Sequence, residues 1–205
     1  MPQDRQPPLH ISKRIFDIAA SVVGLVLTAP VTAIIAIGVR TTSPGPAIYR
    51  ASRVGLNGKP FTLYKFRSMR TTDAGEGTRI TAAGDSRVTR IGKVLRATKL
   101  DELPQLVNVL RGDMSIVGPR PEDPTYVSEY TEAQKLILNW RPGLTSPASI
   151  QYRHEEDLLS AAGDLETAYA TIMDAKIQLD LSYFSSSSLR SDLVIIFRTM
   201  SSLFK

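Results

Sequence analysis

The chain has 205 residues, a formal net charge of +5 and no cysteine. The lack of cysteine excludes disulfides and thiolate metal sites, and it is typical of proteins from a reducing compartment. Residues 40–99 carry a net charge of +10, which indicates an anionic partner, whereas residues 155–180 carry a net charge of −6.

Residues 1–11 are predicted to be a polar leader, and residues 12–42 are predicted to be a membrane element. Within this element, residues 18–39 are 22 consecutive uncharged positions. A helix over them would be about 33 Å long, which is enough to cross the hydrocarbon core of a bilayer. Pro30 lies inside the stretch and predicts a break, because proline removes a helical hydrogen bond and clashes with the preceding turn.

Basic residues flank this apolar stretch on both sides: Lys13 and Arg14 precede it, and Arg40 follows it. Positive charge favours the cytoplasmic side, so a simple span would place one basic flank outside. A re-entrant hairpin, broken at the proline and returning to the same face, removes this conflict; a kinked single-pass anchor is the alternative. In a hairpin, the carbonyl freed at the break would need a partner from packed protein or from a hydroxyl such as that of Ser21 or Thr28.

Residues 43–205 are predicted to form one cytosolic catalytic domain that is mainly helical. Two strands over residues 47–54 and 61–66 are expected to form a short β-hairpin, because Asn57-Gly58 between them is a strong turn signal. A short helix is expected over residues 88–97.

Residues 96–121, RATKLDELPQLVNVLRGDMSIVGPRP, are the most informative stretch of the chain. Apolar residues at helical spacing predict a helix over residues 102–111, with Pro104 in its first turn. Two adjacent carboxylates, Asp101 and Glu102, would then lie at the start of this helix.

Cations surround these two acids: Arg96 and Lys99 precede them, and Arg111 and Arg120 follow them. This arrangement suits phosphate chemistry with a divalent metal, because carboxylates bind the metal while cations and a helix end bind phosphate oxygens. On spacing alone, a capping residue beside a favourable first-turn charge explains the two acids as well.

The C-terminal part of the chain is predicted to contain two helices. The first, over residues 155–183, would have an acidic outer face. The second, over residues 189–204, would lie in the membrane interface or pack on the core. Its apolar face would consist of Leu189, Leu193, Ile196, Met200 and Leu203.

Several short motifs occur in an order and spacing that resemble one family, the monotopic phosphoglycosyl transferases, which are bacterial sugar transferases. The resemblance runs from about residue 12 to residue 147. The matching motifs are Lys13-Arg14-Ile15-Phe16-Asp17, Ser43-Pro44-Gly45-Pro46, Tyr64-Lys65-Phe66-Arg67-Ser68-Met69, Arg87-Val88-Thr89-Arg90-Ile91-Gly92, Leu100-Asp101-Glu102-Leu103-Pro104-Gln105, Gly112-Asp113-Met114-Ser115, Gly118-Pro119-Arg120-Pro121 and Arg141-Pro142-Gly143-Leu144-Thr145.

The chain departs from the commonest pattern of this family in two places. A Ser-Pro pair usually lies at the membrane break, whereas this chain has Ala29-Pro30. After the last motif many members continue with a Trp-containing segment, whereas here Ser146-Pro147-Ala148-Ser149 follows, which indicates a subfamily.

The resemblance implies a monotopic, membrane-associated α/β protein in which a small catalytic domain is attached to a re-entrant helix hairpin. It implies a bacterial inner-membrane enzyme, with its domain on the cytoplasmic face, that transfers a sugar 1-phosphate from a UDP-sugar to polyprenol phosphate. Membrane lipid is a further expected partner, and a homodimer stays open. Nucleic acid is not expected, because the aromatic residues do not interleave with the basic ones as a stacking platform requires.

In this reading Asp101 is the nucleophile and the ligand of Mg²⁺, and Glu102 handles a proton or orients the acceptor phosphate. The cations expected to bind phosphate oxygens are Lys65, Arg67, Arg96, Arg120 and Arg141. The rival hypothesis is a non-catalytic, membrane-anchored protein that binds anionic lipid or nucleic acid through its basic face.

Overall fold

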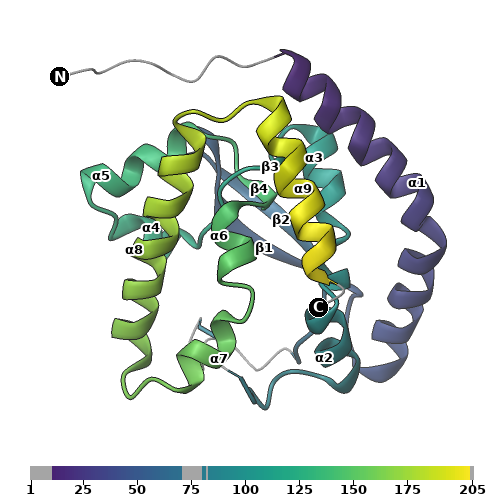
Figure 1. Cartoon of the computed structure of the whole chain (residues 1–205). Helices are drawn as coiled ribbons and strands as arrows, with labels where there is room; N and C mark the ends of the chain where they lie inside the picture. The colour runs from purple at the N-terminus through teal and green to yellow at the C-terminus, as the bar shows by residue number, and fades with distance from the viewer. Residues whose placement is uncertain (1–10, 71–79, 82, 204–205) are drawn as a thin grey trace.

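The computed structural model describes residues 11–70, 80, 81 and 83–203. It is a mainly helical body with two small sheets at its centre and one long helix, α1 (Ile11–Thr42), along its side (Figure 1). The predicted helical domain with a β-hairpin is confirmed. Of the expected polar leader, residues 1–10 lie outside the described part of the chain. The other helices are α2 (Arg90–Ala97), α3 (Gln105–Arg111), α4 (Pro124–Ser128), α5 (Glu132–Lys135), α6 (Pro147–Gln151), α7 (Glu155–Ser160), α8 (Leu165–Phe184) and α9 (Leu189–Leu203).

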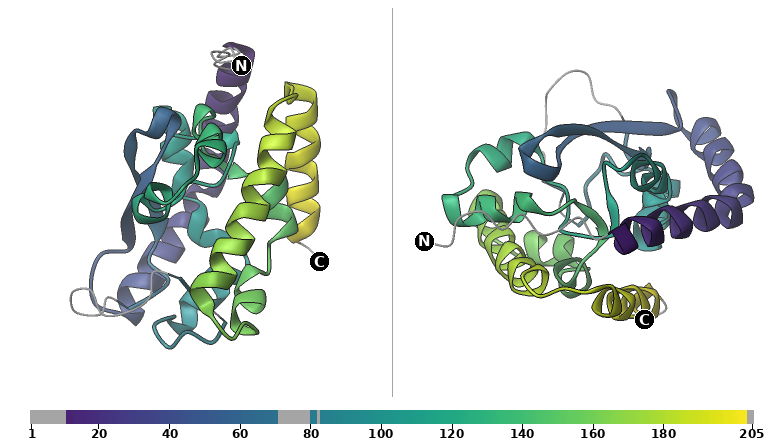
Figure 2. Two further views of the ribbon diagram at one scale, coloured as in Figure 1. Left: turned by 90° about the vertical axis from the view of Figure 1, so that its left-hand side faces the viewer. Right: turned by 90° about the horizontal axis from the view of Figure 1, so that it is seen from above.

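Helix α1 continues through Pro30 and bends about midway, as the right-hand view in Figure 2 shows. The sequence predicted two helices separated by a break, and the structure has one bent helix instead. The hydroxyl of Thr28 donates to the carbonyl of Gly24 at 2.7 Å, and that of Ser21 donates to the carbonyl of Asp17 at 2.7 Å. Neither hydroxyl therefore reaches the carbonyl four residues before the proline, although such side-chain bonds help to bend a helix.

The outer face of α1 is apolar and exposed, with Leu27 73% and Ile34 70% exposed. The helix is long and apolar enough to cross a membrane. An uncovered apolar face of this length fits contact with lipid better than contact with water.

Polar side chains fasten the first turns of α1 to the domain. Arg14 donates to the carbonyls of Val109 and Leu110 at the end of α3, at 2.7 and 2.8 Å. The carboxylate of Asp17, a residue only 1% exposed, accepts a hydrogen bond from the backbone N–H of Ile116 at 3.0 Å. These residues belong to the first family motif, so that motif connects the helix to the domain.

Lys13, in the same motif, reaches two other elements. Its ammonium donates to the carbonyl of Val117 at 3.0 Å and pairs with Asp192 of α9. The basic flank before the apolar stretch is therefore bonded within the protein.

The last turns of α1 are also packed on the domain. Ile35 and Val39 form a buried cluster with Phe66 and Leu95. Both ends of α1 thus contact the same domain.

Strands β1 (Ile48–Val54) and β2 (Pro60–Phe66) form the predicted antiparallel hairpin, with Ile48 opposite Phe66 and Val54 opposite Pro60. The loop between the strands runs from Gly55 to Lys59, and in it Asn57 and Gly58 have positive φ, 56° and 74°, which these two residue types adopt more readily than most. The strand prediction is confirmed to within one residue at each end.

A second sheet, which the sequence did not predict, pairs strands β3 (Ser115–Val117) and β4 (Gly143–Thr145) in parallel. Gly118 and Gly143 lie back to back, so a Cβ on either would collide with the backbone of the other. This close approach places the two Gly/Pro motifs side by side and fixes the segment that carries Arg120.

The C-terminal part holds three helices rather than the predicted two. The single helix expected over residues 155–183 is wrong: α7 and α8 are separate, and Asp164 caps α8 by accepting from the N–H of Glu166 at 3.2 Å. In α9, Ile195 is buried in the core, whereas Leu193 and Met200 are about half exposed. The predicted apolar face of this helix is therefore split between the core and the surface.

Candidate active site

The turn that carries the two acids begins with a left-handed residue. Lys99 has φ 58° and ψ 15°, an unfavourable conformation for a residue with a Cβ. A 3₁₀ turn over Leu100–Glu102 follows, and α3 starts only at Gln105. The helix predicted over residues 102–111 therefore begins three residues late, and the acids lie in a tight turn before it.

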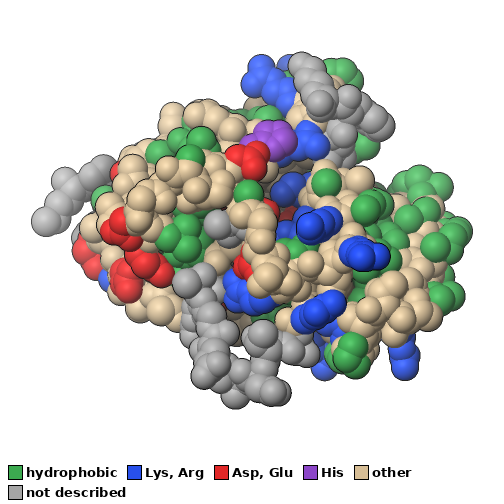
Figure 3. All heavy atoms as spheres, turned by 90° about the horizontal axis from the view of Figure 1, so that it is seen from below, with side chains coloured by type: hydrophobic (Ala, Val, Ile, Leu, Met, Phe, Trp, Pro, Cys, Tyr) green, Lys and Arg blue, Asp and Glu red, His purple; other side chains and the backbone are tan. Residues whose placement is uncertain are grey.

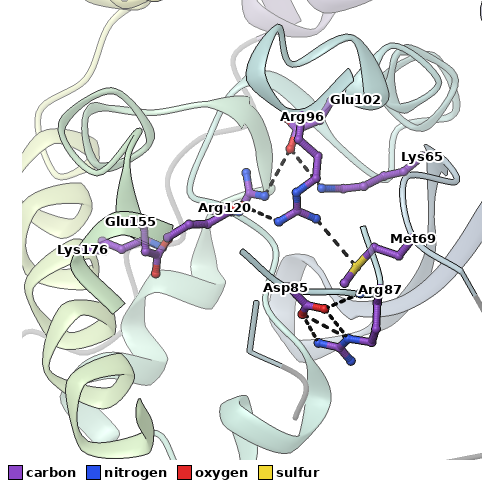
Figure 4. Close-up of polar contacts among 10 residues, drawn as sticks. Lys65, Met69, Asp85, Arg87, Arg96, Glu102, Arg120, Glu155 and Lys176 are labelled. Carbon is purple, nitrogen blue, oxygen red and sulfur yellow. Dashed lines mark hydrogen bonds and ion pairs between the residues drawn. The ribbon is translucent and has the colours of Figure 1, made fainter. Parts of the chain in front are cut away.

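The carboxylate of Glu102 binds two cations from distant parts of the chain. Its Oε1 accepts hydrogen bonds from Lys65 of β2 at 3.0 Å and from Arg120, after β3, at 3.2 Å (Figure 4). Burial raises the pKa of Glu102, but the charges of Lys65, Arg120 and Lys99 outweigh this effect and lower it. Glu102 is therefore ionised in the folded protein.

Asp101 is buried beside this group, with 5% of the residue exposed. Burial raises the pKa of its carboxyl, and the charge of Lys65 opposes the rise. Its Oδ1 atom has no hydrogen-bond partner among the described residues. A buried oxygen without a partner is available to a phosphorus atom or to a cation.

The donors fit the expected magnesium ion only in part. Mg²⁺ is commonly bound by one or two carboxylates together with substrate phosphates, and Asp101 can supply such a carboxylate. No group of three or more acidic or histidine side chains that could hold a metal occurs among residues 11–70, 80, 81 and 83–203. Substrate phosphates would therefore have to complete the coordination.

Arg96, near the end of α2, lines the same cavity as Lys65 and Arg120. Its guanidinium pairs with Glu156 of α7, and Nη1 lies 3.9 Å from the sulfur of Met69. Figure 4 shows the Arg96 guanidinium between Met69 and Arg120.

Three adjoining cavities, of about 180, 400 and 170 Å³, surround these side chains. Lys65, Arg96 and Arg120 all line the first cavity, and Arg120 also lines the third. Lys99 lines the second and third. Asp101 lines none of these three, whereas its neighbour Glu102 lines the third.

The space-filling view in Figure 3 shows how charge is distributed on this face of the molecule. Acidic side chains gather on one side, and Lys and Arg side chains gather across the middle and the other side. A negatively charged substrate is thus attracted to the middle of the face.

Two of the predicted phosphate-binding cations lie elsewhere. Arg67, 4% exposed, donates to the carbonyls of Val39 and Ser43 at 3.3 and 2.8 Å, at the end of α1. Arg141 lies close enough to Arg14 and Asp17 for their charges to act on it. Neither arginine lines any of the three cavities, so the structure does not bring them to Glu102.

Sequence reasoning missed part of the site. Glu155 of α7 and Lys176 of α8 line the first and third cavities, and Tyr169 of α8 lines the first. The only signal was that Lys176 is the single cation in the acidic segment 155–180.

These elements together can bind a diphosphate close to a buried carboxylate. Lys65, Arg96 and Arg120 supply positive charge around one cavity, and Arg120 offers the planar fork that matches phosphate oxygens. The left-handed turn places Asp101 directly before Glu102, the residue that binds Lys65 and Arg120.

Known proteins are similar to this chain over nearly its whole length. A sequence model of the family described as bacterial sugar transferase matches residues 9–205. The chain is 40% identical over 198 residues to a UDP-glucose:undecaprenyl-phosphate glucose-1-phosphate transferase of Caulobacter vibrioides, covering 95% of this chain and 70% of that protein. It is 38% identical over 195 residues to an enzyme of the same name from Escherichia coli, covering 93% of this chain and 40% of that protein.

A further relative bears a different sugar in its name. The chain is 37% identical over 191 residues to a UDP-N-acetylgalactosamine-undecaprenyl-phosphate N-acetylgalactosaminephosphotransferase of Aeromonas hydrophila, covering 92% of this chain and 42% of that protein. This chain thus spans only about two fifths of the Escherichia and Aeromonas relatives. The match over residues 9–205 nevertheless decides the classification: the chain belongs to the bacterial sugar transferase family.

Proposed function

We propose that this protein transfers a sugar 1-phosphate from a UDP-sugar to polyprenol phosphate, with release of UMP. The observation that carries the proposal is the cavity lined by Lys65, Arg96 and Arg120, two of which, Lys65 and Arg120, bind the Glu102 carboxylate beside buried Asp101. The names of the relatives, which are transferases between UDP-sugars and undecaprenyl phosphate, support it.

Asp101 is the proposed nucleophile. Its carboxylate oxygen forms a bond to the phosphorus that bears the sugar, while the bond from that phosphorus to UMP breaks and UMP leaves with the electron pair. The product is an aspartyl phosphosugar. An oxygen of polyprenol phosphate then attacks the same phosphorus, so that the bond to Asp101 breaks and polyprenyl-diphospho-sugar forms.

The cations act by positioning and by charge stabilisation, which provide most of the catalysis in phosphoryl transfer. Arg120 and Lys65 bind phosphate oxygens, and Glu102 holds both cations in place until the substrate arrives. Mg²⁺ bound through Asp101 would offset the charge of the diphosphate.

For the membrane, we propose a re-entrant arrangement of α1 at the cytoplasmic face of the bacterial inner membrane. The support is that Arg14 and Asp17 at one end, and Val39 at the other, contact the same domain. A straight span would carry one end away from that domain. Such an arrangement holds the site at the depth of the acceptor phosphate.

The test of the activity is release of UMP by the protein in nanodiscs, with Mg²⁺, a panel of UDP-sugars, and polyprenol phosphate present or absent. Release that depends on the acceptor, with one or a few sugars, is the expected result. Folded protein that releases no UMP from any sugar would favour a binding protein instead.

The absence of native cysteine makes the topology test clean. Single cysteines in place of Arg5 and Lys59 should both react with an impermeant maleimide in inverted membrane vesicles and not in intact cells. Reaction of the cysteine at position 5 in intact cells alone would support the single-pass anchor.

A further inference from the structure

The first cavity has a second charged wall besides the one that holds Lys65, and this second wall lines the third cavity too. Lys176 of α8 pairs with Glu155 of α7, with Nζ 2.8 Å from Oε2. Both side chains are mostly buried, with 12% and 20% exposed. Figure 4 shows this pair and Lys65 on opposite sides of Arg120.

Arg120 lies between the two walls. Its Nη2 donates to Glu102 at 3.2 Å, and the charge of Glu155 acts on it from the other side. If the diphosphate lies against Lys65, Arg96 and Arg120 with its sugar-bearing phosphate toward Glu155, the group attached to that phosphate lies beyond Arg120. In a UDP-sugar that group is the sugar.

The charge of the second wall suits a neutral group better than another phosphate. Glu122, Glu155 and Glu156 line the first cavity, and Lys176 is the cation that α8 adds to its lining. Glu155 uses Oε2 for Lys176, and its Oε1 is buried without a hydrogen-bond partner in the described part of the chain. A carboxylate oxygen of this kind accepts a hydrogen bond from a hydroxyl, and an ammonium donates one.

Aromatic rings complete this wall. Tyr169 of α8 and Tyr126 of α4 both line the first cavity, with ring centroids 4.8 Å apart. Aromatic faces pack against the carbon–hydrogen faces of a sugar ring, while acids and amines bind its hydroxyls.

We propose that Glu155 and Lys176, with Tyr169 beside them, bind the hydroxyls of the donor sugar and determine which UDP-sugar is accepted. This inference rests on the proposed function, because it takes the diphosphate to lie on the wall that holds Lys65. A site that hydrogen-bonds a hydroxyl discriminates strongly against a sugar that lacks it or presents it differently.

The experiment measures binding by calorimetry, with protein in nanodiscs, so that it does not depend on turnover. The probes are UMP, UDP, UDP-glucose, UDP-galactose and UDP-N-acetylgalactosamine. The variants are Lys176→Met and Glu155→Gln. The matched control is Lys135→Met, since Lys135 pairs with Glu132 at the same 2.8 Å on the exposed surface of α5.

For both site variants, the affinity for UDP and UMP should stay within about twofold of wild type. The affinity for the preferred UDP-sugar should fall tenfold or more, and the ratio between sugars should change, as the loss of one hydrogen bond to a hydroxyl predicts. The control should bind all five probes as wild type does. Glu155→Gln retains the shape of the side chain, so it tests the inference even if Lys176→Met fails to fold.

Two results would overturn the inference. Equal losses for UDP and for every UDP-sugar would mean that the pair supports the nucleotide or the fold, and unchanged sugar affinity in both variants would mean that the sugar lies elsewhere. Failure of the proposed function has a different signature, because wild-type protein would then bind none of the UDP-sugars.

Discussion

Arg120 places its Nη2 atom 3.2 Å from Oε1 of Glu102, although 18 residues separate them in the chain. The same oxygen accepts from Lys65 at 3.0 Å. One carboxylate therefore orients two cations from separate elements before any substrate is bound. Preorganised charge of this kind needs no rearrangement during phosphoryl transfer.

Replacing Glu102 by Gln should destabilise the protein at neutral pH. Without the carboxylate, Lys65 and Arg120 are left close together and only partly solvated, and a loss of about 1–3 kcal/mol in the free energy of unfolding is expected at pH 7. Because the pKa of Glu102 is lowered in the folded state, the loss should shrink as the pH falls below its ordinary value near 4.5. Urea titrations in detergent at pH 7 and pH 4 measure this, and equal stability of variant and wild type at pH 7 would contradict it.

Asp101→Asn should abolish turnover without unfolding the protein. The amide is nearly the same size as the buried carboxyl but is not a nucleophile, so UMP release should fall by a factor of about 10³ or more. Thermal unfolding and membrane association should remain close to wild type. Retention of a tenth of the wild-type rate would exclude Asp101 as the nucleophile.

Local patterns in the sequence predicted the elements that depend on neighbouring residues. The hairpin follows from Asn57-Gly58, and α1 follows from its long uncharged run. The sequence placed Glu102, Lys65 and Arg120 in three separate motifs, but it did not predict that Glu102 binds both cations. No periodicity indicates it, because the hydrogen bonds join three separate elements.

The features that the sequence missed depend on long-range packing or on single backbone angles. Lys99 is left-handed although it is not glycine, which moves the start of α3 to Gln105. Arg67 comes directly after β2, and only the position of the end of α1 shows that its guanidinium caps that helix. Lys176 is one residue on a long helix, and its direction is decided by how α7 packs on α8.

Arg67 and Arg120 lie in different places, which predicts that Arg67 supports the fold and that Arg120 binds the substrate. Arg67→Lys loses the Nη2 atom that donates to the carbonyls of Val39 and Ser43, so the free energy of unfolding should fall by about 1–3 kcal/mol while the KM for the UDP-sugar stays within twofold. Arg120→Lys should instead lower kcat/KM tenfold or more. The same kinetic loss in both variants would show that Arg67 binds substrate after all.

We expect the carboxylate of Asp17 to be needed for the attachment of α1 to the domain. In Asp17→Ala the N–H of Ile116 loses its acceptor in a buried place, and the free energy of unfolding should fall by about 1–3 kcal/mol. Activity should fall too, because the site is then no longer fixed relative to the membrane. Ile18→Ala, at the exposed neighbouring position, is the control. Equal stability of the two variants would contradict the role of Asp17.

Asp180 should give the protein a stability that depends on pH. This α8 residue is 3% exposed and accepts from the N–H of Ala148 at 3.0 Å, in the segment that departs from the family pattern. Burial raises its pKa to about 6, so the folded protein binds the proton more tightly than the unfolded chain. The contribution of Asp180 to stability should therefore be highest when its carboxyl is protonated, and it should fall as the pH rises from 4 to 6.

Asp180→Asn removes this charge and retains an oxygen for the N–H of Ala148. Relative to wild type, the variant should gain up to about 3 kcal/mol between pH 4 and pH 7, since one pKa unit corresponds to about 1.36 kcal/mol. Asp164→Asn gives the opposite sign, because the hydrogen bond from Thr167 lowers the pKa of that exposed acid and its charge favours folding above its ordinary pKa. Urea titrations of the three proteins across this range measure both differences. A difference between Asp180→Asn and wild type that is flat from pH 4 to pH 7 would show that Asp180 ionises equally in both states and that its burial is relieved by a neighbour.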